Sequence, residues 1–165
     1  MCESCRGKAV VTADGEGQAI WYDGGLMIIR ADAAQTGGSV SLVEARLPAG
    51  KATPLHAHPD SEETILVLAG EITVHIDGVD HQLVAGGSWT VRRGTPHAFA
   101  VTSDGARLLV TFTPGGGEAF FVAAGVPAPT RDVPPPAPPD LDRYRAAAER
   151  TGLVLLGPPP FQRPM

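Results

Sequence analysis

Short runs of aliphatic, β-branched and aromatic residues fill the chain from Ala19 to about Thr113, and glycine, proline or aspartate interrupts them at short intervals. This alternation is typical of an all-β barrel or sandwich, because each run suits a strand and a turn signal follows it directly. Asp77-Gly78 is the strongest hairpin signal. We expect strands at Ala19–Asp23, Leu26–Ala31, Ser39–Leu47, Glu63–Ala69, Glu71–Asp77, Ser88–Arg92, His97–Val101 and Arg107–Thr113.

The composition changes after the last of these runs. Pro114–Gly117 ends the β region, and Glu118–Ala124 is expected to form a short helix. The paired Phe120 and Phe121 of this helix could cover one opening of the barrel or pack on a partner subunit. Residues 127–139 then hold seven prolines, which favours an extended, semi-rigid connector.

A second helix is expected near the C-terminus. Asp140 stands at an N-cap position before Leu141–Arg150, and Gly152 follows as a stop signal. Val154–Leu156 could add a short strand. The small and apolar residues of this helix share one face, which should dock on the barrel or on a neighbouring subunit: Leu141, Tyr144, Ala147, Ala148 and Thr151.

These features divide the chain into five parts. A length of 165 residues suits one compact domain. The parts are an N-terminal arm (1–18), a β-barrel (19–113), a short helix (114–126), a Pro-rich connector (127–139) and a C-terminal helix and tail (140–165).

Charge and hydropathy exclude several classes of function. The net charge is -5, and no cluster of basic residues is visible beyond Arg92-Arg93, which we interpret as a solvated turn. Nucleic acid is therefore not an expected partner. No run of about 18 apolar residues occurs, and the first residues lack the apolar core of a signal peptide, so we expect a cytoplasmic protein without a membrane partner.

Both cysteines lie at the extreme N-terminus, at Cys2 and Cys5. A four-thiolate zinc site would need a second pair, and a thioredoxin motif would need a following βαβ pattern. We interpret this element as a mobile end. A surface redox switch or an opportunistic metal contact remains open for it.

Three of the five histidines lie in two short segments that also contain a suitable acid. His56 and His58 are two residues apart, so on an extended segment both side chains leave the same face. Glu63 begins the next apolar run, and a carboxylate there is costly unless it is paired or binds a cation. His97 opens a later strand and can supply a fourth ligand from across the barrel.

The neighbouring residues have simpler interpretations. Glu62 should point away from Glu63 into solvent, with a minor alternative in which it replaces Glu63 as the ligand. Phe99 shares a face with His97 and could line a substrate pocket. His75 and His81 flank the Asp77-Gly78 hairpin and are assigned to surface or hairpin packing, while Trp89 and Phe112 are assigned to the core.

Three imidazoles and one carboxylate, with no thiolate, argue against a structural zinc site. This donor set suits one divalent ion, Fe, Mn, Ni, Co or catalytic Zn, and leaves one or two positions for water or a small-molecule substrate. The sequence therefore predicts a metal site formed by His56, His58, Glu63 and His97, without identifying the metal.

Two motifs in this region resemble those of the cupin superfamily. The residues Gly50, His56, His58, Glu63 and Gly70 match the first cupin motif in type and spacing. The residues Gly86, Arg92, Gly94 and His97 resemble the second motif, with Arg92 in place of the usual proline and Val101 in place of the usual asparagine. The resemblance implies a double-stranded β-helix, or jelly-roll, barrel that holds one metal ion.

The stretch Leu108–Phe121 also looks like the barrel exit of bacterial single-domain cupins described as quercetin 2,3-dioxygenase-like. That resemblance implies a metal-dependent dioxygenase for an enolic, flavonol-like or polyketide-like molecule. Glu63 would then both bind the metal and accept the substrate's hydroxyl proton. Cupins are commonly dimeric, so the resemblance also implies a homodimer.

Two other functions remain open at the level of sequence. One is a metal-dependent isomerase, cyclase or lyase acting on a sugar or a polyketide-like intermediate. The other is a non-catalytic cupin that binds or senses a small molecule; no DNA-binding segment is recognisable in the sequence to support a transcriptional role. Oxygen consumption separates the dioxygenase from both.

Overall fold

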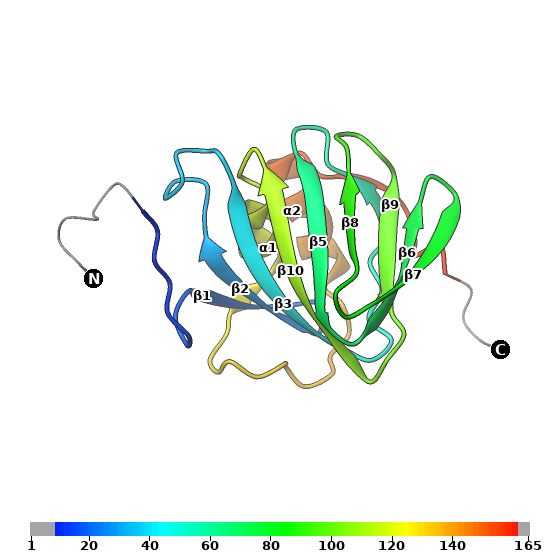
Figure 1. The fold of residues 1–165 in the computed structure, drawn as a ribbon, viewed down its shortest axis with the longest axis horizontal. Helices are drawn as coiled ribbons and strands as arrows, with labels where there is room; N and C mark the ends of the chain where they lie inside the picture. Colours follow the sequence, from blue (N-terminus) through cyan, green and yellow to red (C-terminus); the bar gives the residue numbers. More distant parts are fainter. Residues whose placement is uncertain (1–8, 162–165) are drawn as a thin grey trace.

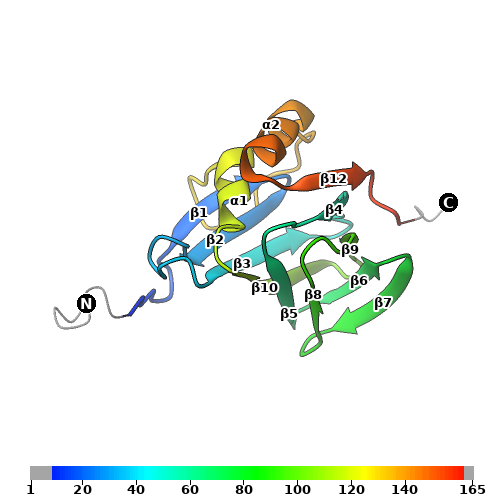
Figure 2. The same cartoon turned by 90° about the horizontal axis from the view of Figure 1, so that it is seen from above.

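The structure is a computed structural model that describes residues 9–161, so the interpretation of Cys2 and Cys5 lies outside the described residues. The chain forms a β-barrel of two antiparallel sheets with two helices across one end (Figures 1 and 2). The expected all-β jelly-roll barrel is confirmed. The larger sheet has the strand order β11-β1-β2-β3-β10-β5-β8, and the smaller has the order β12-β4-β9-β6-β7.

The strands and helices follow in the order of the chain. The first strands are β1 (Gln18–Tyr22), β2 (Gly25–Ala31), β3 (Ser41–Pro48), β4 (Leu55–Ala57), β5 (Glu62–Ala69) and β6 (Glu71–Ile76). The later strands are β7 (Val79–Val84), β8 (Ser88–Val91), β9 (His97–Val101), β10 (Gly105–Thr113), β11 (Val126–Pro127) and β12 (Val154–Gly157). The helices are α1 (Glu118–Ala124) and α2 (Leu141–Thr151).

Strand β10 illustrates how the sequence builds the core. Leu108, Val110 and Phe112 are buried, whereas the residues between them are more exposed. Alternate side chains of a strand point to opposite faces, so this strand presents one face to the barrel interior. Its central position between β3 and β5 places that face at the middle of the larger sheet.

Three strands were missed by the sequence analysis, β4, β7 and the two-residue β11, and all three have weak local signals. Strand β4 has only three residues and follows a proline. Strand β7 is polar and almost entirely exposed, because it pairs only with β6 at the edge of the smaller sheet. The predicted Asp77-Gly78 hairpin is confirmed between β6 and β7, although Asp77 belongs to the turn rather than to β6; Asp77 has φ 49° and Gly78 has φ 83°.

Both helices lie where the sequence predicts them. The Asp140 carboxylate accepts a hydrogen bond from the Arg143 backbone N–H at 3.0 Å, and Gly152 is left-handed at φ 75°. Helix α2 packs on α1 and buries Ala147 and Ala148. The expectation that Leu141 also docks is wrong, because its side chain is 55% exposed.

The C-terminal segment returns to the chain's own barrel rather than leaving it. Strand β12 pairs antiparallel with β4 and extends the smaller sheet (Figure 2). The buried Glu118 carboxylate at the start of helix α1 attaches the helix to the barrel. It accepts hydrogen bonds from the Ala33 and Gly116 backbone N–H groups and from the Ser41 hydroxyl. Among the described helices, none has the length and apolar character needed to span a bilayer.

Candidate metal centre

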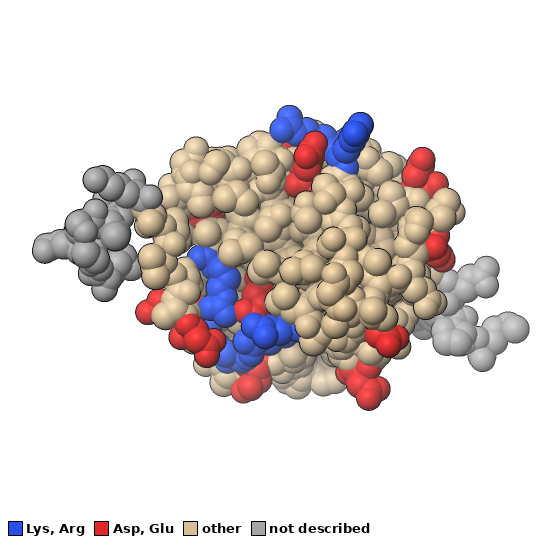
Figure 3. Space-filling view, viewed as in Figure 1, with Lys and Arg blue, Asp and Glu red and all other residues tan. Residues whose placement is uncertain are grey.

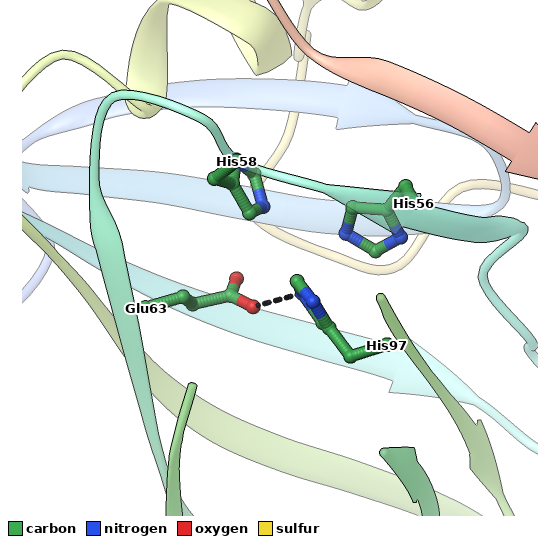
Figure 4. Close-up of side chains that lie close together, drawn as sticks. All are labelled: His56, His58, Glu63 and His97. Carbon is green, nitrogen blue, oxygen red and sulfur yellow. Dashed lines mark hydrogen bonds and ion pairs between the residues drawn. The ribbon is translucent and has the colours of Figure 1, made fainter. Parts of the chain in front are cut away.

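Four side chains from three strands and a loop converge inside the barrel. His56 comes from β4, His58 follows that strand, Glu63 comes from β5 and His97 from β9. One nitrogen or oxygen atom from each lies within 4.8 Å of the others (Figure 4). We call these four residues the metal cluster. The structure therefore brings together every residue that the sequence proposed as a ligand.

Strand register explains this convergence. His56 is paired with His97 across β4 and β9, and their ring centroids are 4.3 Å apart. On β5, alternation buries Glu63 at 6% exposure and leaves Glu62 exposed, as expected. The period of two in a strand thus decides which of two adjacent carboxylates enters the barrel.

Backbone carbonyls orient two of the imidazoles. His56 Nδ1 lies 2.8 Å from the Pro54 carbonyl oxygen, and His97 Nδ1 lies 2.8 Å from the Thr95 carbonyl oxygen. An Nδ1–H that donates to a carbonyl fixes the ring orientation and leaves Nε2 to face the centre. Metal-binding histidines in proteins usually have such a partner.

Electrostatics favours the ligating form of the carboxylate. Burial raises the pKa of Glu63, but the hydrogen bond from His97 and the charges of His58 and His97 outweigh burial and lower it to about 2. His97 Nε2 lies 2.9 Å from Glu63 Oε2. Burial lowers the pKa of His97, but this carboxylate raises it to a net value above its usual range.

The other two imidazoles are held neutral. Burial is the largest cause that lowers the pKa of His56 to about 4, and the nearby His97 lowers it further. Burial likewise lowers the pKa of His58. Neutral imidazole and ionised carboxylate are the forms that bind a metal ion.

One atom of the metal cluster is left without a partner among the described residues. His58 Nε2 is buried and makes no hydrogen bond. Buried polar atoms in proteins are nearly always satisfied, so this unpaired nitrogen is free to bind a ligand from outside the chain. Its position beside a carboxylate and two further imidazoles fits a divalent cation, and the donor set is that of a site with open positions.

The metal cluster opens into an interior cavity of about 60 Å³. The cavity wall is mainly apolar and includes Phe99, as the sequence proposed. A cleft of about 240 Å³ adjoins it at the surface, and His58, Gly117, Phe120 and Leu153 line both spaces. The two spaces therefore share part of one wall next to the metal cluster.

The sequence analysis missed four polar residues of the cavity wall: Tyr22, Lys51, Thr53 and Tyr144. They lie outside both histidine segments and come from β1, the β3–β4 turn and α2, so no local pattern joins them. The sequence contained one weak indication, for Lys51. Lys51 is one of only two lysines in the chain and stands just before the first histidine segment.

The remaining interpretations hold. His75 and His81 lie on the β6–β7 hairpin, and His75 Nδ1 is 2.6 Å from an Asp80 carboxylate oxygen. Trp89 and Phe112 are buried in the core. Arg92 and Arg93 are exposed in a turn, as expected.

Comparisons with known proteins agree with this architecture. Residues 43–114 match the profile of the family described as a cupin domain. Quercetin 2,3-dioxygenase of Bacillus subtilis is 31% identical over 145 residues, which are 86% of this chain and 43% of that protein. The HTH-type transcriptional regulator PuuR of Escherichia coli is 46% identical over 54 residues, 32% of this chain and 29% of that protein.

The chain spans less than half of the length of each of these curated relatives. Among solved structures, KdgF from Halomonas sp. superposes with a TM-score of 0.61 at 16% identity. That superposition covers 67% of this chain and 98% of KdgF, and at such low identity it concerns the fold alone.

Proposed function

Because residues 43–114 of this chain form a cupin domain, we propose that the chain binds one divalent metal ion at the metal cluster and acts as a dioxygenase on a small enolic molecule. The observation that carries this proposal is the convergence of four ligand atoms at the mouth of an apolar cavity. One of these atoms, His58 Nε2, has no hydrogen-bond partner among the described residues. The similarity to quercetin 2,3-dioxygenase supports the choice of reaction.

A bound metal ion and Glu63 would have different roles in the reaction. A bound ion would supply Lewis acidity and, if it is redox-active, electron transfer toward dioxygen. Glu63 is ionised and can accept a proton from a substrate hydroxyl at its carboxylate oxygen.

The character of the cavity wall suits this class of substrate. The wall is mostly apolar and would exclude water from a ring placed next to the metal cluster. The enclosed space of about 60 Å³ is smaller than the roughly 150 Å³ that holds a benzene ring in a protein interior, so its wall would have to open to admit such a ring.

Metal analysis of the purified protein, combined with dioxygen uptake on a panel of enolic aromatic compounds that includes quercetin, tests the proposal. We expect a redox-active metal at about one ion per chain and dioxygen uptake with at least one compound. Zinc as the native metal, with no uptake after reloading by iron, manganese, nickel or cobalt, would refute the dioxygenase.

The match to PuuR favours a second candidate, a cupin that binds a small molecule without turnover, since the 54 matched residues belong to a protein named as a transcriptional regulator. A metal-dependent isomerase, cyclase or lyase would use the same ion only to polarise a carbonyl. Compound screening by mass spectrometry separates these candidates, because a binder returns its ligand unchanged and a lyase or isomerase does not.

A further inference from the structure

The interior cavity has a second polar end in addition to the metal cluster. Tyr22, Lys51 and Tyr144 line it together, and they come from three elements that are distant in sequence. We call these three residues the polar anchor. Nothing in the chemistry proposed for the metal cluster uses them.

Lys51 is the unusual member of the polar anchor. Its side chain is only 8% exposed and pairs with the Asp23 carboxylate, which is 24% exposed. Its Nζ also lies 5.5 Å from the centre of the Tyr22 ring. An ammonium carries three N–H donors, and among the described residues Asp23 is the one hydrogen-bond acceptor recorded for Lys51. Donors therefore remain for a ligand in the cavity.

A row of aromatic rings joins the metal cluster to the polar anchor. Ring centroids are 5.2 Å apart between His58 and Phe112, 6.3 Å between Phe112 and Phe121, and 5.5 Å between Phe121 and Tyr22. Tyr22 then stacks on Tyr144 at 5.9 Å with an interplanar angle of 29°. Such a wall suits a flat, apolar molecule that extends from one polar end to the other.

The Tyr144 hydroxyl is suited to donate a hydrogen bond to a ligand. Burial is the largest cause that raises the pKa of Tyr22, and its hydrogen bond to the Tyr144 hydroxyl raises it further. Burial also raises the pKa of Tyr144, which accepts that hydrogen bond and keeps its own O–H free. Both phenols are therefore neutral near pH 7. A neutral phenol donates to an oxygen anion, and an ammonium beside it adds charge.

We propose that the polar anchor binds an acidic oxygen group, a carboxylate or a phenolate, at the end of the substrate that is remote from the metal cluster. The inference rests on the proposed function, since it assumes that the substrate occupies this cavity. It narrows the substrate class to a flat molecule with enolic oxygens at one end and an acidic oxygen at the other.

Matched ligands test the polar anchor without turnover. Catechol carries two adjacent hydroxyls, whereas 3,4-dihydroxybenzoate and caffeate add a carboxylate at two different distances from them. Titration calorimetry with zinc-loaded protein measures the three dissociation constants under anaerobic conditions. We expect at least one acid to bind about tenfold more tightly than catechol, the gain typical of one charge-assisted hydrogen bond.

Lys51→Met should abolish this preference while leaving catechol binding within about twofold of the original, because the variant keeps the aliphatic stem and removes the charge. Tyr144→Phe, which retains the stacked ring, should reduce the preference. Arg145→Met is the matched control, since Arg145 is a 68% exposed cation on the same helix as Tyr144 and should leave the preference intact.

Loss of the ion pair could also perturb folding, because Asp23 would lose its partner. The double variant Lys51→Met with Asp23→Asn removes both charges together, and it should show the same loss of acid preference in a folded protein. Thermal unfolding checks the fold of each variant.

Equal affinity for catechol and both acids would overturn the proposal, and so would an acid preference that survives in the folded double variant. Either result would mean that the Lys51–Asp23 pair only fastens the β3–β4 turn to the end of β1. The outcome is independent of the dioxygenase proposal. Dioxygen uptake without a Lys51-dependent acid preference refutes the polar anchor alone. A Lys51-dependent acid preference without dioxygen uptake refutes the dioxygenase alone.

Discussion

Glu63 is the residue on which the proposed chemistry depends, because it is both a candidate ligand and a candidate base. Its burial beside three imidazoles explains why a carboxylate is tolerated at the mouth of an apolar cavity. Glu62, one residue earlier, is exposed and has none of these contacts. The two positions form a natural pair of test and control.

We predict that Glu63→Gln retains more than half of the metal but loses turnover by about a hundredfold or more, since an amide can still bind the ion and cannot accept a proton. Metal content and dioxygen uptake, measured on the same preparation, check this. Glu62→Gln should change neither. Equal loss of metal and turnover in Glu63→Gln would contradict the role of Glu63 as a base.

At the scale of elements, the buried carboxylate of Glu44 joins three strands of the larger sheet. Glu44 on β3 accepts hydrogen bonds from Arg30 on β2, Arg46 on β3 and Arg107 on β10. Basic and acidic side chains lie side by side on this part of the surface in Figure 3. Burial raises the pKa of Glu44, but the hydrogen bonds from Arg107, Arg30 and Arg46 outweigh burial and lower it to about 2.

This lowered pKa predicts a stability that depends on pH. An unfolded glutamate titrates near ~4.3, so the contribution of Glu44 is present above about pH 5 and is lost as pH falls toward 2. We expect the free energy of unfolding of the native protein relative to Glu44→Gln to shrink by roughly 1 kcal/mol between pH 6 and 3, after allowance for solvent around the exposed arginines. Urea unfolding at both values measures it, and a difference that does not change with pH would be inconsistent with this account.

A second element-scale feature is the support that β12 gives to the metal cluster. His56 lies on a strand of three residues, and that strand pairs with β9 on one side and with β12 on the other. Leu155 of β12 stands opposite His56 in this pairing. The C-terminal segment therefore helps to hold a candidate ligand in place.

Leu155→Pro should weaken metal binding by about tenfold or more, because proline disrupts the strand that flanks His56. Val79→Pro, on the exposed edge strand β7, is the control for a general loss of stability. Competition with a chelator gives both affinities. The positional role of β12 would be excluded if the two variants lost affinity equally.

At the scale of the whole molecule, metal binding should stabilise the fold, because a ligand that binds only the folded state adds its binding free energy to stability. At a free metal concentration about a thousandfold above the dissociation constant, the gain is about 4 kcal/mol, or roughly 10 °C in Tm for a chain of this size. Thermal unfolding with added metal and with chelator tests this. His58→Ala should lose the shift, while His81→Ala on the exposed hairpin should keep it; an equal shift in both would place the metal elsewhere.

Assembly and location stay predictions. The apolar faces that suggested a subunit contact are used within the chain, since Phe120 and Ala147 are both buried in its own core. Leu141 on the same helix as Ala147 remains exposed, so the expected homodimer stays a prediction that sedimentation of the purified protein would decide. Nothing in the described structure bears on the cytoplasmic location.

The sequence by itself determined the all-β class, the two helices and the four members of the metal cluster, and the motif resemblance added the jelly-roll barrel. The all-β class and the ligands follow from local rules: a period of two sends His56 and Glu63 inward, and turn residues mark the ends of the strands. For each of these features, residues close together in the sequence contain enough information for the prediction.

Only the tertiary structure decided what surrounds the metal cluster. Strand β7 is polar and β4 is short, so their existence depends on pairing with partners distant in sequence. The polar anchor likewise exists only because β1, the β3–β4 turn and α2 meet at one end of the barrel. Contacts between remote segments arise from packing of the whole chain, and no local pattern records them.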